Sequence, residues 1–358
     1  MNPLKKRLTR LIQADGAISV AEYMATCLFD PEHGYYTTRE PFGASGDFTT
    51  APEISQMFGE VIASWGWAAW DTLGRPLPFN LTEFGPGRGT LMSDMLRTLE
   101  KLDADFVDQL DVSMIEISPR LRAVQQETLR NAPRAITWRS VLGDMPNPSL
   151  IVANELFDAI PTRQFAKTKA GWRERMVTMS DKDDLQFAVG AAGIDAALLP
   201  AGADAAEEGS IIEISPAREA LMDEIGSHIR SHGGVGLFID YGYTAPPFGD
   251  TLQALRRHAY EDVLASPGEA DLTTHVDFTA LARVAQSHGL ATKIITQGDF
   301  LVGAGLLERA GMLGSGKDDA AQERLRAEVE RLAAPDAMGT LFKVLIVHAA
   351  HHELPQIA

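Results

Sequence analysis

Short apolar runs alternate with helical stretches between residues 79 and 153, and this alternation constrains the fold more than any other feature of the sequence. Residues 79–84, 110–117 and 150–153 have the length of buried strands, and a weaker run lies at residues 137–138. Buried strands that alternate with helices are typical of βαβ units, which build a parallel sheet covered by helices. The pattern therefore predicts an α/β fold with a doubly wound sheet.

A segment without sustained periodicity covers residues 31–53 and is rich in glycine and proline. Structureless loops of this length are uncommon inside a compact domain and are usually functional. Helical spacing of apolar residues predicts one helix from Ser19 and a long one from Ile54. Further helices are expected at residues 275–289, 298–313 and 318–333.

The charge balance disfavours a nucleic-acid partner. The chain has 49 acidic and 32 basic side chains, a net charge of −17, which repels the phosphate backbone that dominates nucleic-acid affinity. The single cysteine, Cys27, fits a reducing compartment. Because no signal-peptide pattern and no apolar run of about 20 residues occurs, we predict a bacterial cytoplasmic protein without membrane insertion.

A glycine turn follows the first of these predicted strands, in the sequence Glu-Phe-Gly-Pro-Gly-Arg-Gly-Thr from Glu83 onward. Glycines let the backbone approach a ligand, and the helix that follows offers free N–H groups. The spacing fits neither the dinucleotide fingerprint nor a Walker loop. Glu83, placed before Gly85, Gly87 and Gly89, suits a ligand with a cationic amino-acid end, which predicts S-adenosylmethionine. For the glycines alone, a plain tight turn is the alternative.

Two more acids stand at the expected ends of the next strands. Glu116 follows the second strand, where a carboxylate can accept hydrogen bonds from both ribose hydroxyls of a nucleoside. Asp144 follows the third strand, where an acid commonly meets the adenine amino group. Three acids at three successive strand ends strengthen the prediction of S-adenosylmethionine, with S-adenosylhomocysteine as the product.

Glu155 and Asp158 follow the fourth strand. Two carboxylates there could bind a guanidinium bidentately and orient one nitrogen toward a methyl donor. The alternative is a helix-turn cap with a salt bridge. Asp240 and Tyr241 add a further polar strand end, for which a simple turn is the alternative. We predict these four residues as catalytic.

Four motifs, at residues 46–60, 83–91, 154–161 and 240–242, occur in this order along the chain. Together they resemble the MidA family of class I methyltransferases, and the resemblance extends over about residues 20–350. It implies a Rossmann-like sheet of seven strands with the last one antiparallel, an N-terminal helical cover and an inserted β substructure.

The expected division of the chain follows from these features. Residues 1–78 form N-terminal helices and the active-site loop, and residues 163–210 form the inserted β substructure with its own hairpins. Residues 79–162 and 211–358 form the cofactor-binding methyltransferase core with C-terminal helical elaborations.

The resemblance implies further site residues beyond the acids and glycines. Additional cofactor-binding residues are expected at Thr50, Pro52, Ser55, Pro86 and Asn154. Substrate-binding residues are expected at Asp47 and Glu53, in the long loop that would fold over the cofactor.

Mitochondrial members of the MidA family methylate an arginine of a respiratory complex I subunit during its assembly, so the resemblance implies a protein-arginine N-methyltransferase. Two alternatives remain open. One is a small-molecule methyltransferase with a closed apolar pocket, and the other is an assembly chaperone that binds S-adenosylmethionine without catalysis. No metal is expected, because the nine histidines show no ligand spacing. The oligomeric state is left open.

Overall fold

The computed structural model describes residues 2–39, 49–245 and 248–357, and the chain divides into two compact units. The first unit takes its residues from the ranges 1–48, 157–220 and 243–277, and the second from 49–156, 221–242 and 278–358. Within the described residues, no helix is long and apolar enough to cross a membrane.

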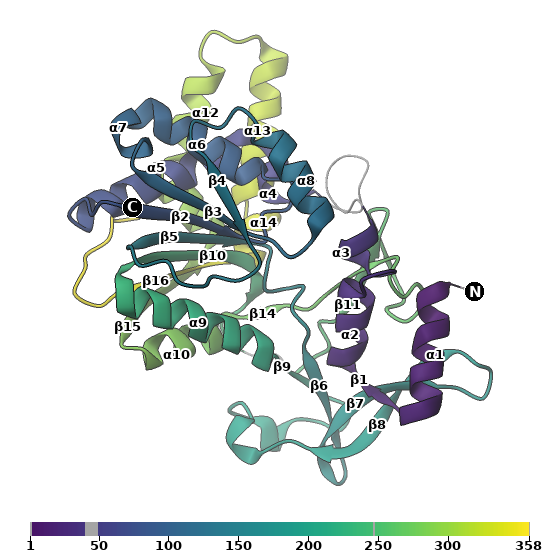
Figure 1. The fold of residues 1–358 in the computed structure, drawn as a ribbon. Coiled ribbons are helices and arrows are strands. Elements are labelled where there is room, and N and C mark those ends of the chain that lie inside the picture. The colour runs from purple at the N-terminus through teal and green to yellow at the C-terminus, as the bar shows by residue number, and fades with distance from the viewer. Residues whose placement is uncertain (1, 40–48, 246–247, 358) are drawn as a thin grey trace. The chain divides into compact units, whose positions relative to one another are not determined.

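A mixed sheet forms the centre of the second unit. Its strands in spatial order are β15 (Leu290–Thr296), β16 (Phe342–Ala349), β10 (Gly234–Tyr243), β5 (Ser149–Asn154), β2 (Phe79–Phe84), β3 (Leu110–Ile115) and β4 (Ile136–Arg139). β16 is antiparallel to both of its neighbours, and the other pairings in this order are parallel (Figure 1). This arrangement confirms the predicted Rossmann-like α/β sheet with one antiparallel strand, formed by the last segment of the chain.

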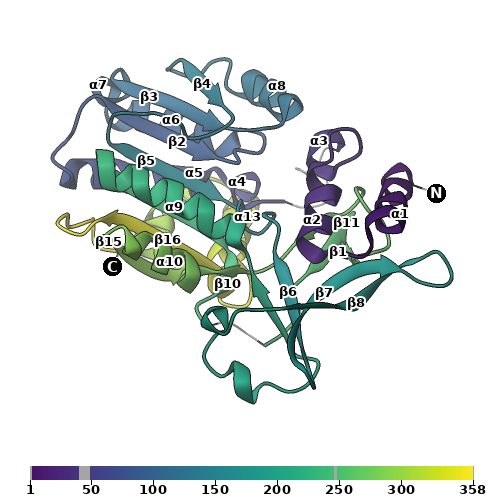
Figure 2. The ribbon, with the colours of Figure 1, turned by 60° about the horizontal axis from the view of Figure 1, so that its bottom comes forward.

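Helices cover both faces of this sheet. In Figure 2, α9 (Pro216–His232) and α10 (Phe278–Ser287) lie over one face, and α5 (Gln56–Thr72) and α6 (Thr90–Leu102) lie on the other side. The remaining helices that belong to this unit are α4 (Ala51–Ile54), α7 (Ala104–Val107), α8 (Pro119–Thr128), α11 (Gln297–Gly303), α12 (Leu306–Gly314), α13 (Asp319–Ala333) and α14 (Met338–Leu341).

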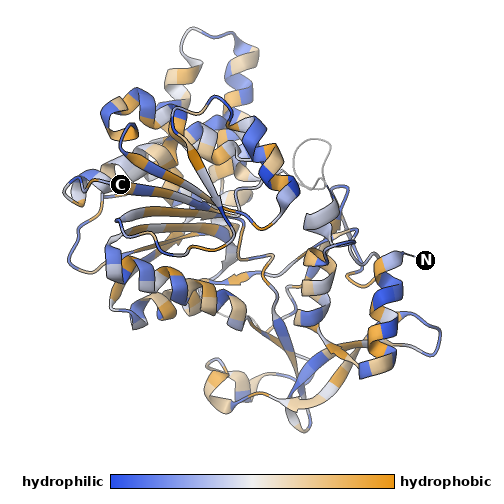
Figure 3. Ribbon diagram, viewed as in Figure 1, coloured by the Kyte–Doolittle hydropathy of each residue, from blue (hydrophilic) through white to orange (hydrophobic). Residues whose placement is uncertain are grey.

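The core of the second unit lies between the sheet and the apolar face of α5. Met57, Val61 and Trp65 are buried at helical spacing, and the ring of Trp65 meets that of Phe300 edge-on with centroids 5.6 Å apart. β2 and β5 are buried along their whole length. Apolar residues accordingly concentrate on the central strands in Figure 3, because strands covered on both faces are shielded from water on both sides.

Two predicted helices have other bounds in the structure. The long helix predicted from Ile54 begins at Gln56 as α5, because Ser55 caps it by accepting a hydrogen bond from the Met57 N–H at 3.2 Å, and Ile54 is the last residue of the short helix α4. The helix predicted over residues 298–313 is split at Gly305, whose φ of 102° is incompatible with a helix.

A buried carboxylate connects three helices of this unit. Glu60 on α5 accepts hydrogen bonds from Arg309 on α12, from Nε at 2.7 Å and from Nη2 at 3.0 Å. Arg97 on α6 lies 3.3 Å from the same carboxylate and 2.9 Å from Asp94. Burial raises the pKa of Asp94 to about 6, against the lowering effect of Arg97. These contacts hold α5, α6 and α12 together.

Replacing Arg309 by methionine should lower the free energy of unfolding by about 2 kcal/mol, because the Glu60 carboxylate stays buried with Arg97 as its remaining cation. Urea unfolding measures the loss. Arg326→Met is the matched control, since Arg326 pairs with Glu323 where the two side chains are 66% and 73% exposed. That control should lose less than about 0.5 kcal/mol. Equal losses in the two variants would contradict the prediction.

The first unit combines helices with two antiparallel sheets, and it also contains the short strand β14, which belongs to neither of them. Its elements are α1 (Pro3–Asp15), α2 (Val20–Phe29), α3 (Tyr35–Thr38), β1 (Ile18–Ser19), β6 (Arg163–Thr168), β7 (Gly171–Met179), β8 (Leu185–Gly193), β9 (Ile211–Ile214), β11 (Gln253–Arg256), β12 (Ala259–Glu261), β13 (Asp271–Thr273) and β14 (Val276–Asp277). β6, β7 and β8 form the hairpins expected within residues 163–210. The sheet of β11, β12 and β13 was not predicted, because strands of three or four residues are too short to display alternation.

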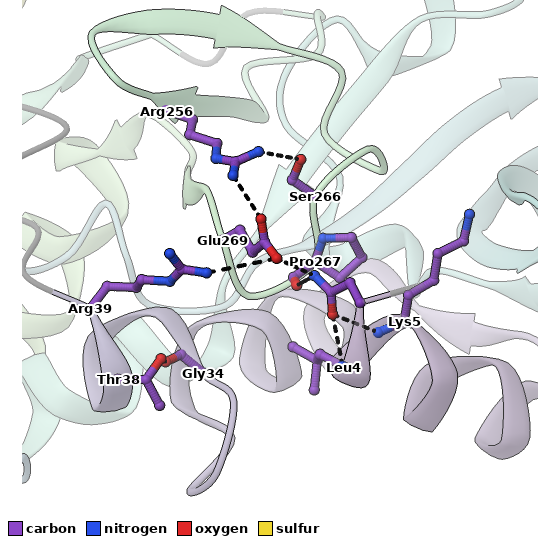
Figure 4. Close-up of polar contacts among 10 residues, drawn as sticks. Leu4, Lys5, Gly34, Thr38, Arg39, Arg256, Ser266, Pro267 and Glu269 are labelled. Carbon is purple, nitrogen blue, oxygen red and sulfur yellow. Dashed lines mark hydrogen bonds and ion pairs between the residues drawn. The ribbon is translucent and has the colours of Figure 1, made fainter.

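A polar network fixes the start of α1 within the first unit (Figure 4). Asn2 caps the first turn of α1, and its Nδ2 donates to the Pro267 carbonyl at 2.7 Å and to Glu269 at 3.2 Å. Glu269 also pairs with Arg256 at 2.7 Å and with Arg39 at 3.7 Å. Segments that lie far apart in the sequence are thereby joined.

Candidate functional site

The carboxyl ends of β2 and β5 lie where the order of the sheet reverses. From β2 the chain runs outward through β3 and β4, and it then returns to β5 on the other side of β2. Phe84 pairs with Ala153, so the segments that follow the two strands start side by side. In open α/β sheets, ligands bind outside the carboxyl ends at such a reversal.

The glycine turn occupies this position. Gly85, Gly87 and Gly89 have φ values of 59°, 51° and 82°, which few other residues adopt. A Cβ at Gly85 would lie 2.8 Å from a Leu156 methyl group. Pro86 accepts a hydrogen bond from the Gly89 N–H at 2.7 Å, which closes the turn before α6 begins. The turn therefore needs its glycines both for backbone conformation and for space.

Two buried acceptor atoms stand at these strand ends. Glu83 is 3% exposed and Asn154 is 9% exposed. Within the described chain, neither Glu83 Oε2 nor Asn154 Oδ1 has a hydrogen-bond partner. Burial raises the pKa of Glu83 to about 8, although a hydrogen bond from the Met92 N–H opposes the rise. Buried acceptors of this kind suit an ammonium group, which brings both donors and a compensating charge.

Glu116, directly after β3, is held by two donors. Its Oε1 accepts from the Ser118 N–H at 2.7 Å, and its Oε2 accepts from Gln125 Nε2 at 3.1 Å. Burial raises the pKa of Glu116, and these hydrogen bonds lower it. The neighbouring Ile117 and Val141 are each 63% exposed, although both are large and apolar. This combination suits a nucleoside, because the carboxylate can accept hydrogen bonds from the ribose and the apolar side chains can pack against the base.

Ile117, Val141 and Gln125 are further candidate site residues that sequence reasoning did not single out. For Ile117, the sequence showed an apolar residue directly after an acid at a strand end. Apolar periodicity does not indicate whether such a side chain stays exposed. For Gln125 the only signal was a polar residue on the buried face of a short helix.

Asp144 lies exposed in the loop between β4 and β5. It acts electrostatically on His228, whose ring hydrogen-bonds Ser149 at 2.9 Å. Ser149 is the first residue of β5, at the end of that strand opposite the glycine turn. The contact of Asp144 with adenine stays a prediction.

Glu53 on α4 is tied to the glycine turn. One of its carboxylate oxygens accepts from the Thr90 hydroxyl at 2.5 Å, and the other lies 3.5 Å from Arg88 Nη1. These contacts join α4 to the start of α6. The predicted contact of Glu53 with substrate stays a prediction.

The other loop residues of the predicted site mark helix starts. Thr50 precedes α4 and is buried, Pro52 lies in the first turn of α4, and Ser55 caps α5. Their contacts with the cofactor stay predictions. Asp47 lies outside the described residues.

Glu155 has a strained backbone at the end of β5. Its φ of 51° falls in the left-handed region that non-glycine residues seldom adopt. Its Oε1 accepts from Asn154 Nδ2 at 3.0 Å and from the Ala51 N–H at 3.3 Å, and its own N–H donates to the Ile239 carbonyl at 2.9 Å. Strain that costs about 1 kcal/mol and is held by such contacts is common at functional sites.

Asp240 was predicted at a strand end, but it lies within β10, which continues to Tyr243 because Asp240 and Tyr241 still pair with β16. It directly follows the Ile239 that Glu155 contacts. Asp240 is fully buried and accepts from the Tyr241 N–H at 2.9 Å. The ring of Tyr241 packs edge-on against Phe342, with centroids 5.4 Å apart. The structure therefore brings the main chains of Glu155 and Asp240 together, whereas the catalytic roles of Asp240 and Tyr241 stay predictions.

Asp158 belongs to the first unit. It is 5% exposed, and its carbonyl accepts from Arg218 Nη2 at 3.0 Å and from the Thr274 N–H at 3.1 Å. The joint action of Asp158 with Glu155 on one guanidinium stays a prediction. Among the described residues, no group of three or more potential metal ligands gathers.

Comparison with known proteins places this geometry in a family. A family described as S-adenosyl-L-methionine-dependent methyltransferases matches residues 61–296. The protein arginine methyltransferase NDUFAF7, mitochondrial, of Homo sapiens is 34% identical over 96% of this chain and 82% of its own length. The Drosophila melanogaster homologue is 34% identical over 97% of this chain and 86% of its own length.

A solved structure is similar over nearly the whole chain. It is a Burkholderia thailandensis protein bound to S-adenosyl-homocysteine. It is 30% identical, the match covers 96% of this chain and 91% of that one, and the TM-score is 0.85. The predicted resemblance and fold are thereby confirmed.

The predicted bacterial cytoplasmic location was wrong, because the curated relatives are mitochondrial proteins. The prediction used the single cysteine and the absence of a signal-peptide pattern. Both are compatible with more than one reducing compartment, so they could not decide between them.

Proposed function

The chain belongs to the MidA-like family of S-adenosyl-L-methionine-dependent methyltransferases, and from this membership we propose that it methylates an arginine side chain of a protein. The names of the curated relatives, which match nearly the whole chain, support this substrate class. The structural observation that carries the proposal is the Glu155 carboxylate, oriented by Asn154 and Ala51 at the reversal point of the sheet.

Different residues of the second unit bind different parts of the cofactor. Glu83 Oε2 and Asn154 Oδ1 accept from its ammonium group, which supplies the donors that these buried atoms need. The glycine turn admits the chain of the amino acid, and Glu116 accepts from the ribose hydroxyls. Ile117 and Val141 shield the adenine from water, since both are exposed without it.

Glu155 binds and orients the substrate guanidinium. When bound, S-adenosylmethionine supplies an electrophilic methyl group on its sulfonium. A guanidinium stays protonated with a pKa above about 12, so its nitrogens are poor nucleophiles in water. A carboxylate held in one orientation would fix one nitrogen toward this methyl group. It would accept the proton that the nitrogen loses as the N–C bond replaces the S–C bond, with S-adenosylhomocysteine as the leaving group.

The finer proposal is that the substrate is a subunit of respiratory complex I, which is what the MidA resemblance implies. The net charge of −17 favours attraction of a basic polypeptide segment. We also propose that Asp158, Asp240 and Tyr241 assist Glu155, as the sequence predicts.

The substrate class is tested with tritiated S-adenosylmethionine and two peptides that differ only in arginine or lysine at one position. We take the peptides from basic segments of complex I subunits and expect label on the arginine peptide at least about 100 times faster than on its lysine partner, because lysine cannot bind a carboxylate bidentately. A panel of neutral small molecules serves as the comparison. Label on small molecules alone, or tight cofactor binding without any transfer, would contradict the proposal.

A further inference from the structure

Gln125 is a polar residue in a position that normally takes an apolar one. It lies on the inner face of α8 with Leu121 and is fully buried. Burying a primary amide costs about 1 to 3 kcal/mol unless its donors and acceptor are hydrogen-bonded. The contacts of its amide group should therefore explain why a polar residue occupies this buried position.

The amide of Gln125 makes three hydrogen bonds. Its Nε2 donates to the Gly87 carbonyl at 2.9 Å and to Glu116 Oε2 at 3.1 Å, and its Oε1 accepts from Trp138 Nε1 at 2.9 Å. A carbonyl can only accept and an indole N–H can only donate. The two partners therefore determine which end of the amide faces Glu116, and that end is the donor.

These three partners come from three successive strands. Gly87 lies in the turn after β2, Glu116 follows β3, and Trp138 belongs to β4. A Cβ at Gly89 would lie 3.6 Å from the Gln125 Cα, so α8 packs directly against the glycine turn. Gln125 thus connects the turn with the acid to which the ribose contact is assigned.

We infer that Gln125 is a positioning residue of the nucleoside half of the cofactor site, which keeps the Glu116 carboxylate aimed at the ribose hydroxyls. This inference rests on the proposed ribose contact of Glu116. Loss of the Gln125 donor removes one of the hydrogen bonds that stabilise the Glu116 carboxylate against burial. The residue acts through Glu116 and the turn, and no direct contact with the cofactor is required.

The experiment measures the affinity of the folded protein for S-adenosylhomocysteine and for its 2′-deoxy analogue by calorimetry. Wild type should prefer the intact ribose by about tenfold, the usual value of a hydrogen bond to a charged group. In Gln125→Met this preference should fall toward one. An equal loss for both ligands would show a merely structural role and would overturn the inference.

A second variant guards against misfolding. Gln125→Leu also removes both donors, and it places no second charge beside Glu116, so it should lose the same ribose preference. Glu116→Gln separates the inference from its premise. If Glu116→Gln keeps the full ribose preference, the proposed ribose contact fails. If Glu116→Gln loses the preference while both Gln125 variants keep it, the inference alone fails.

Discussion

Glu155→Gln is expected to lower methyl transfer to an arginine peptide by about 100-fold or more, while the affinity for S-adenosylhomocysteine stays within about twofold of wild type. The substitution keeps the shape of the side chain and the acceptor for the Ala51 N–H, but it removes the charge that binds a guanidinium. Single-turnover transfer of tritiated methyl groups measures the first value, and calorimetry measures the second.

Glu323→Gln is the matched control, because Glu323 is a 73% exposed carboxylate on α13 and should tolerate the same change. Full transfer activity in Glu155→Gln would remove this residue from the mechanism. A parallel loss of cofactor affinity would instead assign Glu155 to the cofactor site, together with its neighbour Asn154.

Glu83→Gln is expected to weaken S-adenosylhomocysteine binding by between about 10- and 100-fold at pH 8, because the buried ammonium loses its charged partner. In wild type, the pKa of about 8 means that free Glu83 is largely protonated at lower pH. Binding must then release a proton, so wild-type affinity should rise with pH up to about 8. Calorimetry between pH 6 and pH 8.5 should show this slope in wild type and its loss in the variant.

The same carboxylate makes the stability of the free protein depend on pH. An unfolded glutamate releases its proton near pH 4.3, whereas folded Glu83 keeps its proton up to about pH 8. Because the folded state binds more protons in this window, its stability falls as pH rises from about 4.3 to 8, by on the order of 3 kcal/mol at pH 7. Glu83→Gln removes this contribution.

Urea unfolding of both proteins across this window measures the difference. As pH rises, the free energy of unfolding of Glu83→Gln should increase relative to that of wild type. Other titrating groups contribute equally to both proteins and cancel in this difference. Parallel curves would show that Glu83 is not the group with the raised pKa. Glu127→Gln, at a 71% exposed position, should run parallel to wild type.

Several local features could be predicted from the sequence because they depend on near neighbours. The helix predicted from Ser19 begins there, and Ser19 forms a capping box with Glu22. The glycine turn adopts three positive φ values, since the spacing of its glycines permits little else. The alternation of apolar runs was sufficient to identify β2, β3 and β5, and it also indicated the weak strand β4.

Other features were outside the reach of such patterns. The contact of Glu53 with Thr90 at the start of α6 spans 37 positions of the sequence, and no local pattern indicated it. The short strands β11, β12 and β13 of the first unit pair with one another, and no periodic pattern in the local sequence indicates this pairing.

By itself, the sequence determined the α/β class, the glycine turn and the acids at successive strand ends, because strand period, turn conformation and helix caps are set within a few residues. Only the tertiary structure decided which of these side chains are buried without a donor, which are held by a neighbour such as Gln125, and that Glu155 is strained. Burial and hydrogen-bond partners depend on residues that folding brings together from distant segments. The raised pKa of Glu83 therefore follows from its buried environment and not from the residue type alone.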